Sequence, residues 1–255
     1  MENQIILVDK PAGISSFGVV AKIRGRLKAE LGHKVKVGHT GTLDPFATGL
    51  LIILTGQMTK KSNEFLKLDK VYEATLKLGY TSTTGDPEGE ITKYTQSIKS
   101  TKIEEHKGKI CQRQILAVEG TKQCDKISDL SHCEASEISG FYTLNTIEST
   151  LKRFLGTITQ TPPRFSAIKI NGERAYKLAR KNQDFEIPSR QVEIYSIDIL
   201  DYHYPNLTIR THVSSGTYIR TLAEDIGKAL NTGAYLTALR RTRIGNYSVD
   251  NAFML

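Results

Sequence analysis

The stretch GHTGTLDPFATGLLIIL, residues 38–54, places a single carboxylate among glycines and threonines directly before an apolar run. The run predicts a buried strand, so the carboxylate of Asp44 would be held beside the core. An Asp-Pro pair commonly begins a turn, and an ordinary polar loop accounts for the spacing. Three glycines around one proline give more backbone freedom than a turn requires, and glycine also lets a ligand approach closely. Both a plain loop and a ligand site remain open here.

The residues before this stretch predict a strand, a helix and a second strand. Residues 5–8 form a short apolar run that a turn at residues 11–13 ends. Ser15 or Ser16 can cap a helix that Gly32 ends. The apolar residues of this helix recur at helical spacing, and they are Val20, Ile23, Leu27 and Leu31. A strand around residues 35–37 would lead into the Asp44 loop.

The residues after the stretch predict a short helix and then a half-buried strand. Thr59 is placed to cap a basic helix over residues 60–68. From Tyr72 to residue 78 apolar and polar side chains alternate, which is the period of a strand with one buried face. The side chain of Tyr72 would therefore face inward. GDPEGE, residues 85–90, predicts a turn.

The C-terminal half returns to regular periodicity. A helix is predicted over residues 144–154, closed by Gly156, and strands over residues 192–195, 199–202 and 207–213. The next helix has apolar residues from 219 to 230, with Tyr218 and Arg220 in its first turn. Short segments around Leu236 and Tyr247 complete the chain. This mixture of strands and helices is compatible with an α+β fold.

Residues 95–140 have only short apolar runs among Lys, Ser, Thr and Glu, so we expect an insertion, partly folded or mobile, within one domain over residues 1–255. The three cysteines of the chain lie there, at positions 111, 124 and 133. With His106 and His132 nearby they suggest zinc, but the C-x-x-C pairs of structural zinc modules are missing. We expect no metal, and the sparse cysteines fit a reducing compartment.

The composition is that of a soluble globular protein, with 39% hydrophobic and 24% charged residues in 255. No basic segment followed by a long apolar run begins the chain, and no apolar run is long enough to span a bilayer, so we expect a cytosolic protein. The net charge is +8, which favours a polyanionic partner such as nucleic acid. A solvated basic face on an ordinary enzyme explains the charge equally well.

Residues 157–181, TITQTPPRFSAIKINGERAYKLARK, combine paired prolines, an Asn-Gly hairpin signal and basic residues interleaved with Phe165 and Tyr176. Aromatic residues among cations suit a single-stranded or looped nucleic acid. A mobile surface loop is the alternative.

Several motifs in order now resemble one family. They are LVDKPAGISSF, VGHTGTLDPFATGLLIILTGQMTK, DKVYEATLKLGYTSTTGDPEG, TPPRFSAIKINGERAY, SSGTYIRTLAEDIG and LRRTRIGNYSV. Together they cover most of the chain outside the insertion, and the chain resembles the bacterial tRNA pseudouridine-55 synthases, the TruB family. The resemblance implies a pseudouridine synthase fold, a mixed curved sheet flanked by helices. It also implies isomerisation of the T-loop uridine U55 of tRNA, without cofactor or metal.

The resemblance assigns the chemistry to a few residues. Asp44 would be the catalytic carboxylate, Arg220 its arginine partner, and Tyr72 the ring that stacks on the flipped uracil. Flipping a base costs roughly a few kcal/mol, and His39 would fill the vacated position. Asp44 could attack C1′, attack uracil C6 or act through a glycal after deprotonation at C2′. Taken singly, an inward tyrosine, a loop histidine and an arginine paired with Glu224 by helical spacing are ordinary structural features.

Further residues follow from the same resemblance. Tyr218 and Leu239 would line the uracil pocket, and Lys10 would support the site from a loop. Residues 162–180 match the family loop that closes over the T-loop, and we expect them to be mobile without RNA. Candidate phosphate contacts, each also explained as a solvated charge, are Lys60, Arg164, Lys169, Arg174, Arg240 and Arg241.

The chain ends shortly after RIGNYSV, so we expect no C-terminal PUA domain. We expect a monomer that acts on the T-arm of tRNA without an obligate protein partner or a membrane. One alternative is a synthase for another RNA or within a guided particle. The other is an RNA-binding or tRNA-folding module whose catalysis is secondary or lost.

Overall fold

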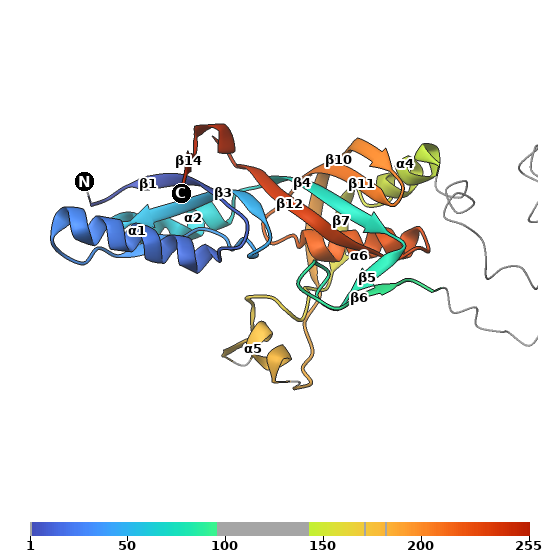
Figure 1. Cartoon of the computed structure of the whole chain (residues 1–255), viewed down its shortest axis with the longest axis horizontal. Helices are drawn as coiled ribbons and strands as arrows, with labels where there is room; N and C mark the ends of the chain where they lie inside the picture. The colour runs from blue at the N-terminus through green and yellow to red at the C-terminus, as the bar shows by residue number, and fades with distance from the viewer. Residues whose placement is uncertain (1, 96–142, 171, 182) are drawn as a thin grey trace, which may run out of the picture.

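A computed structural model describes residues 2–95, 143–170, 172–181 and 183–255 (Figure 1). The predicted insertion, and with it all three cysteines, lies outside these residues apart from its first residue. The main sheet has ten strands in the order β14-β1-β3-β12-β4-β11-β10-β7, with β2 on β3 and β13 on β12. Its strands are β1 (Ile5–Lys10), β2 (Val37–His39), β3 (Thr48–Thr55), β4 (Lys70–Leu78), β7 (Gly156–Gln160), β10 (Arg190–His203), β11 (Asn206–Val213), β12 (Ala234–Ile244), β13 (Tyr247–Ser248) and β14 (Phe253–Met254).

Two hairpins and a set of helices surround this sheet. The hairpins pair β5 (Tyr80–Ser82) with β6 (Ile91–Lys93) and β8 (Lys169–Ile170) with β9 (Glu173–Arg174). The helices are α1 (Ser16–Leu31), η1 (Gly56–Lys61), α2 (Ser62–Leu66), α4 (Leu144–Lys152), α5 (Ala175–Arg180), α6 (Ile219–Ala229) and η4 (Val249–Asn251). None of the helices in the described ranges is long and apolar enough to cross a membrane.

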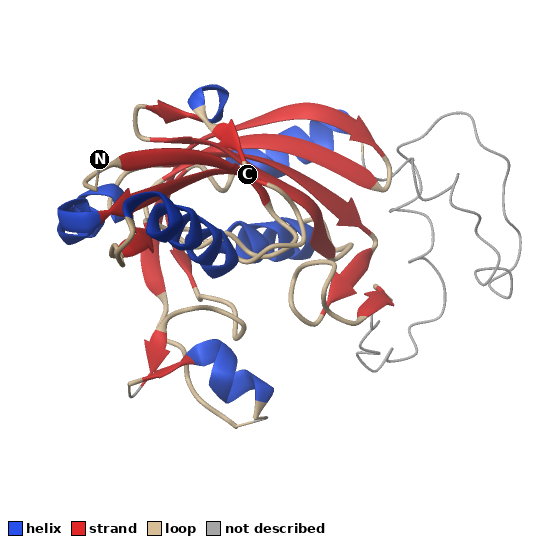
Figure 2. Ribbon diagram, turned by 60° about the vertical axis from the view of Figure 1, so that its left-hand side comes forward, coloured by secondary structure: helices blue, strands red, loops and turns tan. Residues whose placement is uncertain are grey.

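The sheet is mixed, because β12 runs parallel to β3 and antiparallel to β4, and Figure 2 shows it twisted and flanked by helices. The predicted α+β fold with a mixed curved sheet is therefore confirmed. The half-buried strand from Tyr72 is confirmed as well, since buried and half-buried residues alternate along the whole of β4.

One face of the sheet carries both α1 and α6. Arg241 pairs with Gly49 of β3 and with Tyr72 of β4, and directly paired residues point to the same face. Tyr72 packs in the core cluster that includes α6. Leu51 and Ile53, which share the face of Gly49 by alternation, pack against α1. Between the parts of this face that α1 and α6 cover, β12 lies between β3 and β4.

The sequence predicted both ends of α1 correctly. The Ser15 side chain accepts a hydrogen bond from Gly18 N, and Gly32 ends the helix with φ of 75°. Of the predicted stripe the helix buries Val20, Ile23 and Leu27, together with Val19, whereas Leu31 at its end is only partly buried. Residues 60–68 were predicted wrongly: Thr59 Oγ1 donates to Gly56 O inside η1, and α2 begins only at Ser62.

Three further expectations were wrong in extent. The helix predicted over residues 144–154 ends at Lys152. The two strands expected within residues 192–202 form the single strand β10, whose register shifts beside β11 interrupt its alternation. The segment around Leu236 is the 11-residue strand β12, in the middle of the sheet. Register shifts in β12, before Ala238 and before Arg243, hide its period in the sequence.

Candidate active site

Asp44 lies on the loop between β2 and β3, and close packing of the backbone requires a glycine at position 49, the second residue of β3. Gly49 has φ of 101°, and a Cβ there would lie 2.3 Å from the carbonyl oxygen of Arg241 and 2.7 Å from its nitrogen. A side chain is therefore excluded where β12 passes β3. Inside the loop, Ala47 N donates to Asp44 O at 3.1 Å. The position of Asp44 is fixed at the junction of two strands.

Arg220 places its guanidinium between two carboxylates. The residue lies in the first turn of α6 and is 5% exposed. Its Nε is 3.1 Å from Asp44 Oδ2, and its Nη1 is 3.1 Å from Asp86 Oδ2. The alternative of a surface arginine is therefore wrong, and among the described residues no ion pair joins Arg220 to Glu224.

Asp86 is the site residue that the sequence analysis missed, because it stands in a stretch with the composition of a turn. The residue is buried, and its Oδ1 accepts hydrogen bonds from Thr84 Oγ1 at 2.5 Å and Glu88 N at 3.0 Å. The carboxylate is thereby held with its other oxygen toward Arg220. No local period or spacing marks such a residue, and only its long-range partner reveals it.

Arg220 also ties distant segments together through two carbonyl groups. Its Nη1 donates to Thr84 O at 3.0 Å, and its Nη2 donates to Phe165 O at 2.8 Å. One buried side chain thus joins α6 to the Asp44 loop, to residues 84–86 and to the segment that precedes β8. A lysine has a single nitrogen and cannot replace this fork.

Opposing influences act on the pKa of Asp44. Loss of water around the carboxyl raises the pKa of Asp44 above its ordinary value, and the charge of Arg220 opposes that rise. The neighbouring carboxylate of Asp86 raises it further, whereas Lys10 and Arg241 lower it. The pKa of Asp44 is raised overall, and the buried Arg220 is the largest of the influences that favour the anion.

Lys10 is a buried residue with a structural role rather than a solvated charge. It lies at the end of β1 and is 0% exposed. Its Nζ donates to Pro11 O, Ile14 O and Pro45 O at 2.9, 2.7 and 3.1 Å. Burial lowers the pKa of Lys10 to about 8, against the charge of Asp44. Lys10 therefore supports the site by holding the residues next to Asp44.

Tyr72 and Leu239 lie on the face of the sheet that carries α6, and both belong to one buried cluster. Arg241 connects them to the Asp44 loop. Its guanidinium carbon lies 6.0 Å from the centre of the Tyr72 ring, and its Nη2 donates to Gly41 O at 3.1 Å. Arg241 is 1% exposed, so the prediction that it contacts phosphate was wrong. Its role is to join β12 to the loop.

Tyr218 is held from two sides. The buried amide of Gln160 donates to Tyr218 O at 3.0 Å and accepts from Tyr218 N at 2.8 Å. The guanidinium of Arg190 lies 4.8 Å from the centre of the Tyr218 ring. Because Tyr218 comes two residues before Arg220, this clamp also fixes the start of α6. The sequence analysis did not single out Gln160.

His39 ends β2 close to the Asp44 loop. Burial, followed by the charges of Arg241 and Arg174, lowers the pKa of His39, so its ring is neutral near pH 7. Its Nδ1 is buried and has no hydrogen-bond partner among the described residues.

The other candidate phosphate contacts divide into two groups. Arg240 forms two hydrogen bonds with the carboxylate of Asp9, at 3.1 and 2.7 Å, so it is already neutralised. The four remaining candidates have exposed side chains, and they are Lys60, Arg164, Lys169 and Arg174. Lys60 lies on η1, and the other three lie on residues 162–180.

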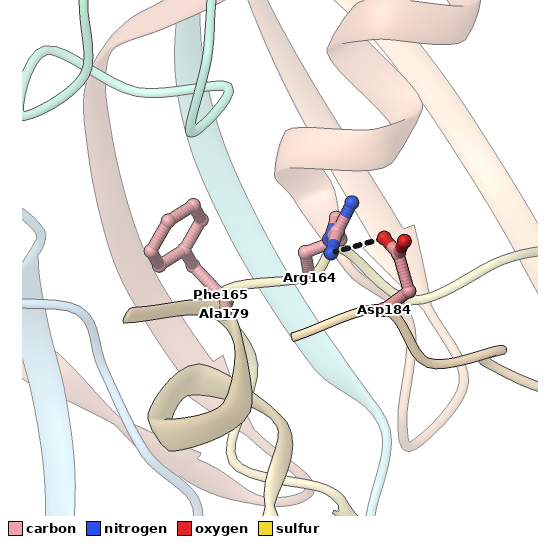
Figure 3. A pocket seen from close by; sticks show the side chains of 4 residues that line it. All are labelled: Arg164, Phe165, Ala179 and Asp184. Atoms are coloured by element: carbon pink, nitrogen blue, oxygen red, sulfur yellow. Dashed lines mark ion pairs between the residues drawn. The ribbon is translucent and has the colours of Figure 1, made fainter. Parts of the chain in front are cut away.

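A small, open pocket of about 290 Å³ is lined by Arg164, Phe165, Ala179 and Asp184 (Figure 3). Arg164 lines it and lies 3.7 Å from Asp184, and its guanidinium is 5.1 Å from the Phe185 ring. Phe165 lines the same pocket while its carbonyl oxygen accepts from Arg220. Within the described ranges, no group of three or more His, Cys, Asp or Glu is placed to hold a metal ion.

Comparisons with known proteins agree across nearly the whole chain. The sequence model described as TruB family pseudouridylate synthase (N terminal domain) matches residues 28–116 and 116–219. The one described as tRNA pseudouridylate synthase B C-terminal domain matches residues 220–255. In the structure this second segment contains α6 and the central strand β12, so it is built into the same sheet.

Among curated proteins, tRNA pseudouridine synthase B of Phocaeicola vulgatus is 41% identical over 251 residues, covering 98% of this chain and 89% of the relative. That of Flavobacterium johnsoniae is 40% identical, with 99% and 93% covered. That of Cupriavidus pinatubonensis is 39% identical, and 65% of its length is covered. A chain in the crystal structure of a Cbf5-Nop10-Gar1 complex is similar with a TM-score of 0.60 and 26% identity, over 98% of this chain and 52% of that one.

Proposed function

Because the chain belongs to the TruB family and is a tRNA pseudouridine synthase, we propose that it isomerises the T-loop uridine U55 of tRNA with Asp44 as the catalytic carboxylate. The observation that supports this assignment is the ion pair of 3.1 Å between Asp44 and Arg220, in which the arginine is 5% exposed and the aspartate 31%. The arginine is sealed in the protein, and the carboxylate remains open to a substrate.

The reaction replaces the N1–C1′ bond of a uridine by a C5–C1′ bond. If Asp44 attacks C1′, the electron pair of the N1–C1′ bond leaves with the uracil, which turns while C1′ is held as an ester. C5 then attacks C1′ and displaces the carboxylate, the proton on C5 is lost, and N1 gains a proton. The routes through uracil C6 or a glycal also start from an ionised Asp44. All three depend on the charge of Arg220.

The flipped base needs a surface on which to stack. Tyr72, Leu239 and Tyr218 are the residues that we assign to the uracil pocket. The clamp of Gln160 and Arg190 supports this for Tyr218, because a pre-positioned ring loses less entropy on binding. His39, with its unpartnered Nδ1, is assigned to the position that the uridine vacates.

The T-arm of tRNA is the proposed partner, and we assign phosphate contacts to Lys60, Arg164, Lys169 and Arg174. Residues 162–180 are proposed to close over the RNA, and the bond from Arg220 to Phe165 O would couple that closure to the site. Hydrogen exchange of these residues should be fast in the free protein and slower with tRNA. Equal protection in both states would contradict the closure. We propose that the protein works as a monomer in the cytosol, without an obligate protein partner.

The test is to incubate the purified protein with unmodified tRNA and map pseudouridine by carbodiimide treatment and primer extension. The wild type should give a stop in the T-loop at U55, and Asp44→Asn should give none. A stop at another uridine would overturn the U55 assignment. Tight tRNA binding without any stop would instead indicate an RNA-binding module.

A further inference from the structure

The exposed surface of α1 carries an aromatic ring and cations on a single flank. Phe17, Arg24 and Lys28 are separated by seven and four residues, which places them above one another on a helix. Phe17 is 64% exposed, and the Arg24 guanidinium lies 5.8 Å from the centre of its ring. We call these three residues the α1 strip. An aromatic ring this exposed contributes little to the core.

The α1 strip begins next to the Asp44 loop and lies on the β2 side of β3, not on the side of β1. Strand β1 occupies one side of β3, and both β2 and β12 pair with the other side. Arg24 Nη2 donates to Val37 O of β2 at 3.3 Å, so the strip lies on the β2 side. The start of α1 is fixed to the Asp44 loop, because Ser16 Oγ donates to Leu43 O at 2.9 Å and accepts from Leu43 N at 2.8 Å.

The charges of α1 lack acidic partners. No cation of this helix forms an ion pair within the described part of the chain, although its sequence has Lys22, Arg24, Arg26 and Lys28 against one acid, Glu30. On β11 and β12, by contrast, three arginines each pair with a carboxylate, and they are Arg210, Arg240 and Arg243. Unpaired positive charge on a helix that starts at the Asp44 loop is complementary to a polyanion.

We propose that the α1 strip binds the RNA strand that adjoins the flipped uridine, with Phe17 stacked on a base or ribose and with Arg24 and Lys28 on phosphates. The proposal rests on the proposed function, because it places the strip beside a nucleotide held at Asp44. The proposed RNA-binding surface of the protein thereby includes α1, a helix that carries no catalytic residue.

The test compares two double variants of one helix. Arg24→Gln/Lys28→Gln removes the charges of the strip, and Lys22→Gln/Arg26→Gln removes the same charge from the opposite flank. Binding of unmodified tRNA is measured against salt concentration. The slope of log K against log salt should fall by about 1.8 for the strip variant, since each phosphate contact contributes about 0.9. It should change by less than about 0.5 for the control variant.

Phe17→Ala is a second variant that leaves the core intact because the ring is exposed. Its Kd for tRNA should rise about fivefold or more, as for the loss of one stacked base. The single-turnover rate at saturating tRNA should stay within twofold of the wild type. Equal slopes for the two double variants together with an unchanged Kd for Phe17→Ala would overturn the proposal. If the wild-type protein makes no pseudouridine but the strip variants still weaken tRNA binding, the proposed function is overturned. The proposal that the α1 strip binds RNA is then unaffected.

Discussion

Two of the clusters that pair an aspartate with an arginine, Asp44 with Arg220 and Asp69 with Arg243, shift the pKa of their carboxyls in opposite directions. Asp44 and Asp69 have side chains of the same exposed fraction, 31%, but many more protein atoms surround Asp44 than Asp69. Loss of water raises the pKa of Asp44 although Arg220 opposes it. Partial burial also acts to raise the pKa of Asp69, but hydrogen bonds from His212 and the backbone, with the charges of His212 and Arg243, lower it overall.

The difference lies in what surrounds each carboxyl. Asp69 lies 2.5 Å from His212 Nε2 and 3.4 Å from Arg243, whose side chain is 40% exposed. Asp44 has one arginine partner, which it shares with a second carboxylate, and that arginine is buried. Asp69 is surrounded by hydrogen-bond donors and connects β11 with β12 through His212 and Arg243. An acid whose pKa stays raised by loss of water, although a buried arginine opposes the rise, is the one that we expect to react.

The largest effect expected from this comparison is that of Asp44→Asn set against Asp69→Asn. An amide keeps the shape but supplies no anion, so Asp44→Asn should lower the single-turnover rate at least about 1000-fold. Asp69→Asn should leave the rate within threefold and affect only stability. Release of tritium from tRNA labelled at uracil C5 measures the rate of each variant. A similar loss in the two variants would remove the distinction between the clusters.

Arg220→Met should come next, with Arg243→Met as its matched control. Arg220 serves two carboxylates and two carbonyl groups in a buried place, so its loss leaves unpaired groups that cost about 3–5 kcal/mol. We expect a lower midpoint of thermal unfolding and a rate reduced about 100-fold or more. Arg243→Met should cost no more than about 1 kcal/mol. Scanning calorimetry and tritium release together decide whether burial of the arginine makes the difference.

Asp86→Asn should give a smaller loss of rate, about tenfold, because Arg220 keeps an oxygen acceptor at that position. Its effect on pH dependence has a definite sign. The charge of Asp86 raises the pKa of Asp44, so its removal should move the acid limb of kcat/KM to lower pH. A limb that moves to higher pH would mean that Asp86 acts mainly by orienting Arg220.

The smallest effect is expected for Lys10→Met. The charge of Lys10 lowers the pKa of Asp44, although Arg220 is the larger influence of that kind. The acid limb should therefore move slightly to higher pH, and by less than in Arg220→Met. Lost hydrogen bonds to Pro11, Ile14 and Pro45 should reduce the rate a few-fold at any pH. A limb that moves further than in Arg220→Met would contradict the proposed order of influences.

Local physics predicted much of the fold. Helix caps and apolar spacing predicted α1 and its ends, and alternation predicted β4, because these features depend on residues near one another in the chain. β12 was missed since register shifts break its period and its paired arginines resemble a surface patch. Arg241 is fully buried there, where its Nε donates to Leu50 O at 2.8 Å. Only the assembled sheet provides that carbonyl.

The candidate site was predictable in part. The ordered motifs named Asp44, Tyr72 and Arg220, whereas the local spacing rule paired Arg220 with Glu224. Its actual partners, Asp44 and Asp86, are far away in the sequence and are brought to it by tertiary structure. Asp86 and Gln160 carry no local signature, because a buried polar residue is recognised by the group that it binds.

The most direct measurement of the central claim is the pH dependence of single-turnover tritium release by the wild type and Arg220→Met. If Arg220 keeps Asp44 ionised, the wild-type rate should fall on acidification with a midpoint above the ordinary aspartate value of about 4. Arg220→Met should shift that midpoint to higher pH, with Arg243→Met unchanged. The same midpoint in all three proteins would contradict the claim that the buried arginine sets the ionisation of a catalytic Asp44.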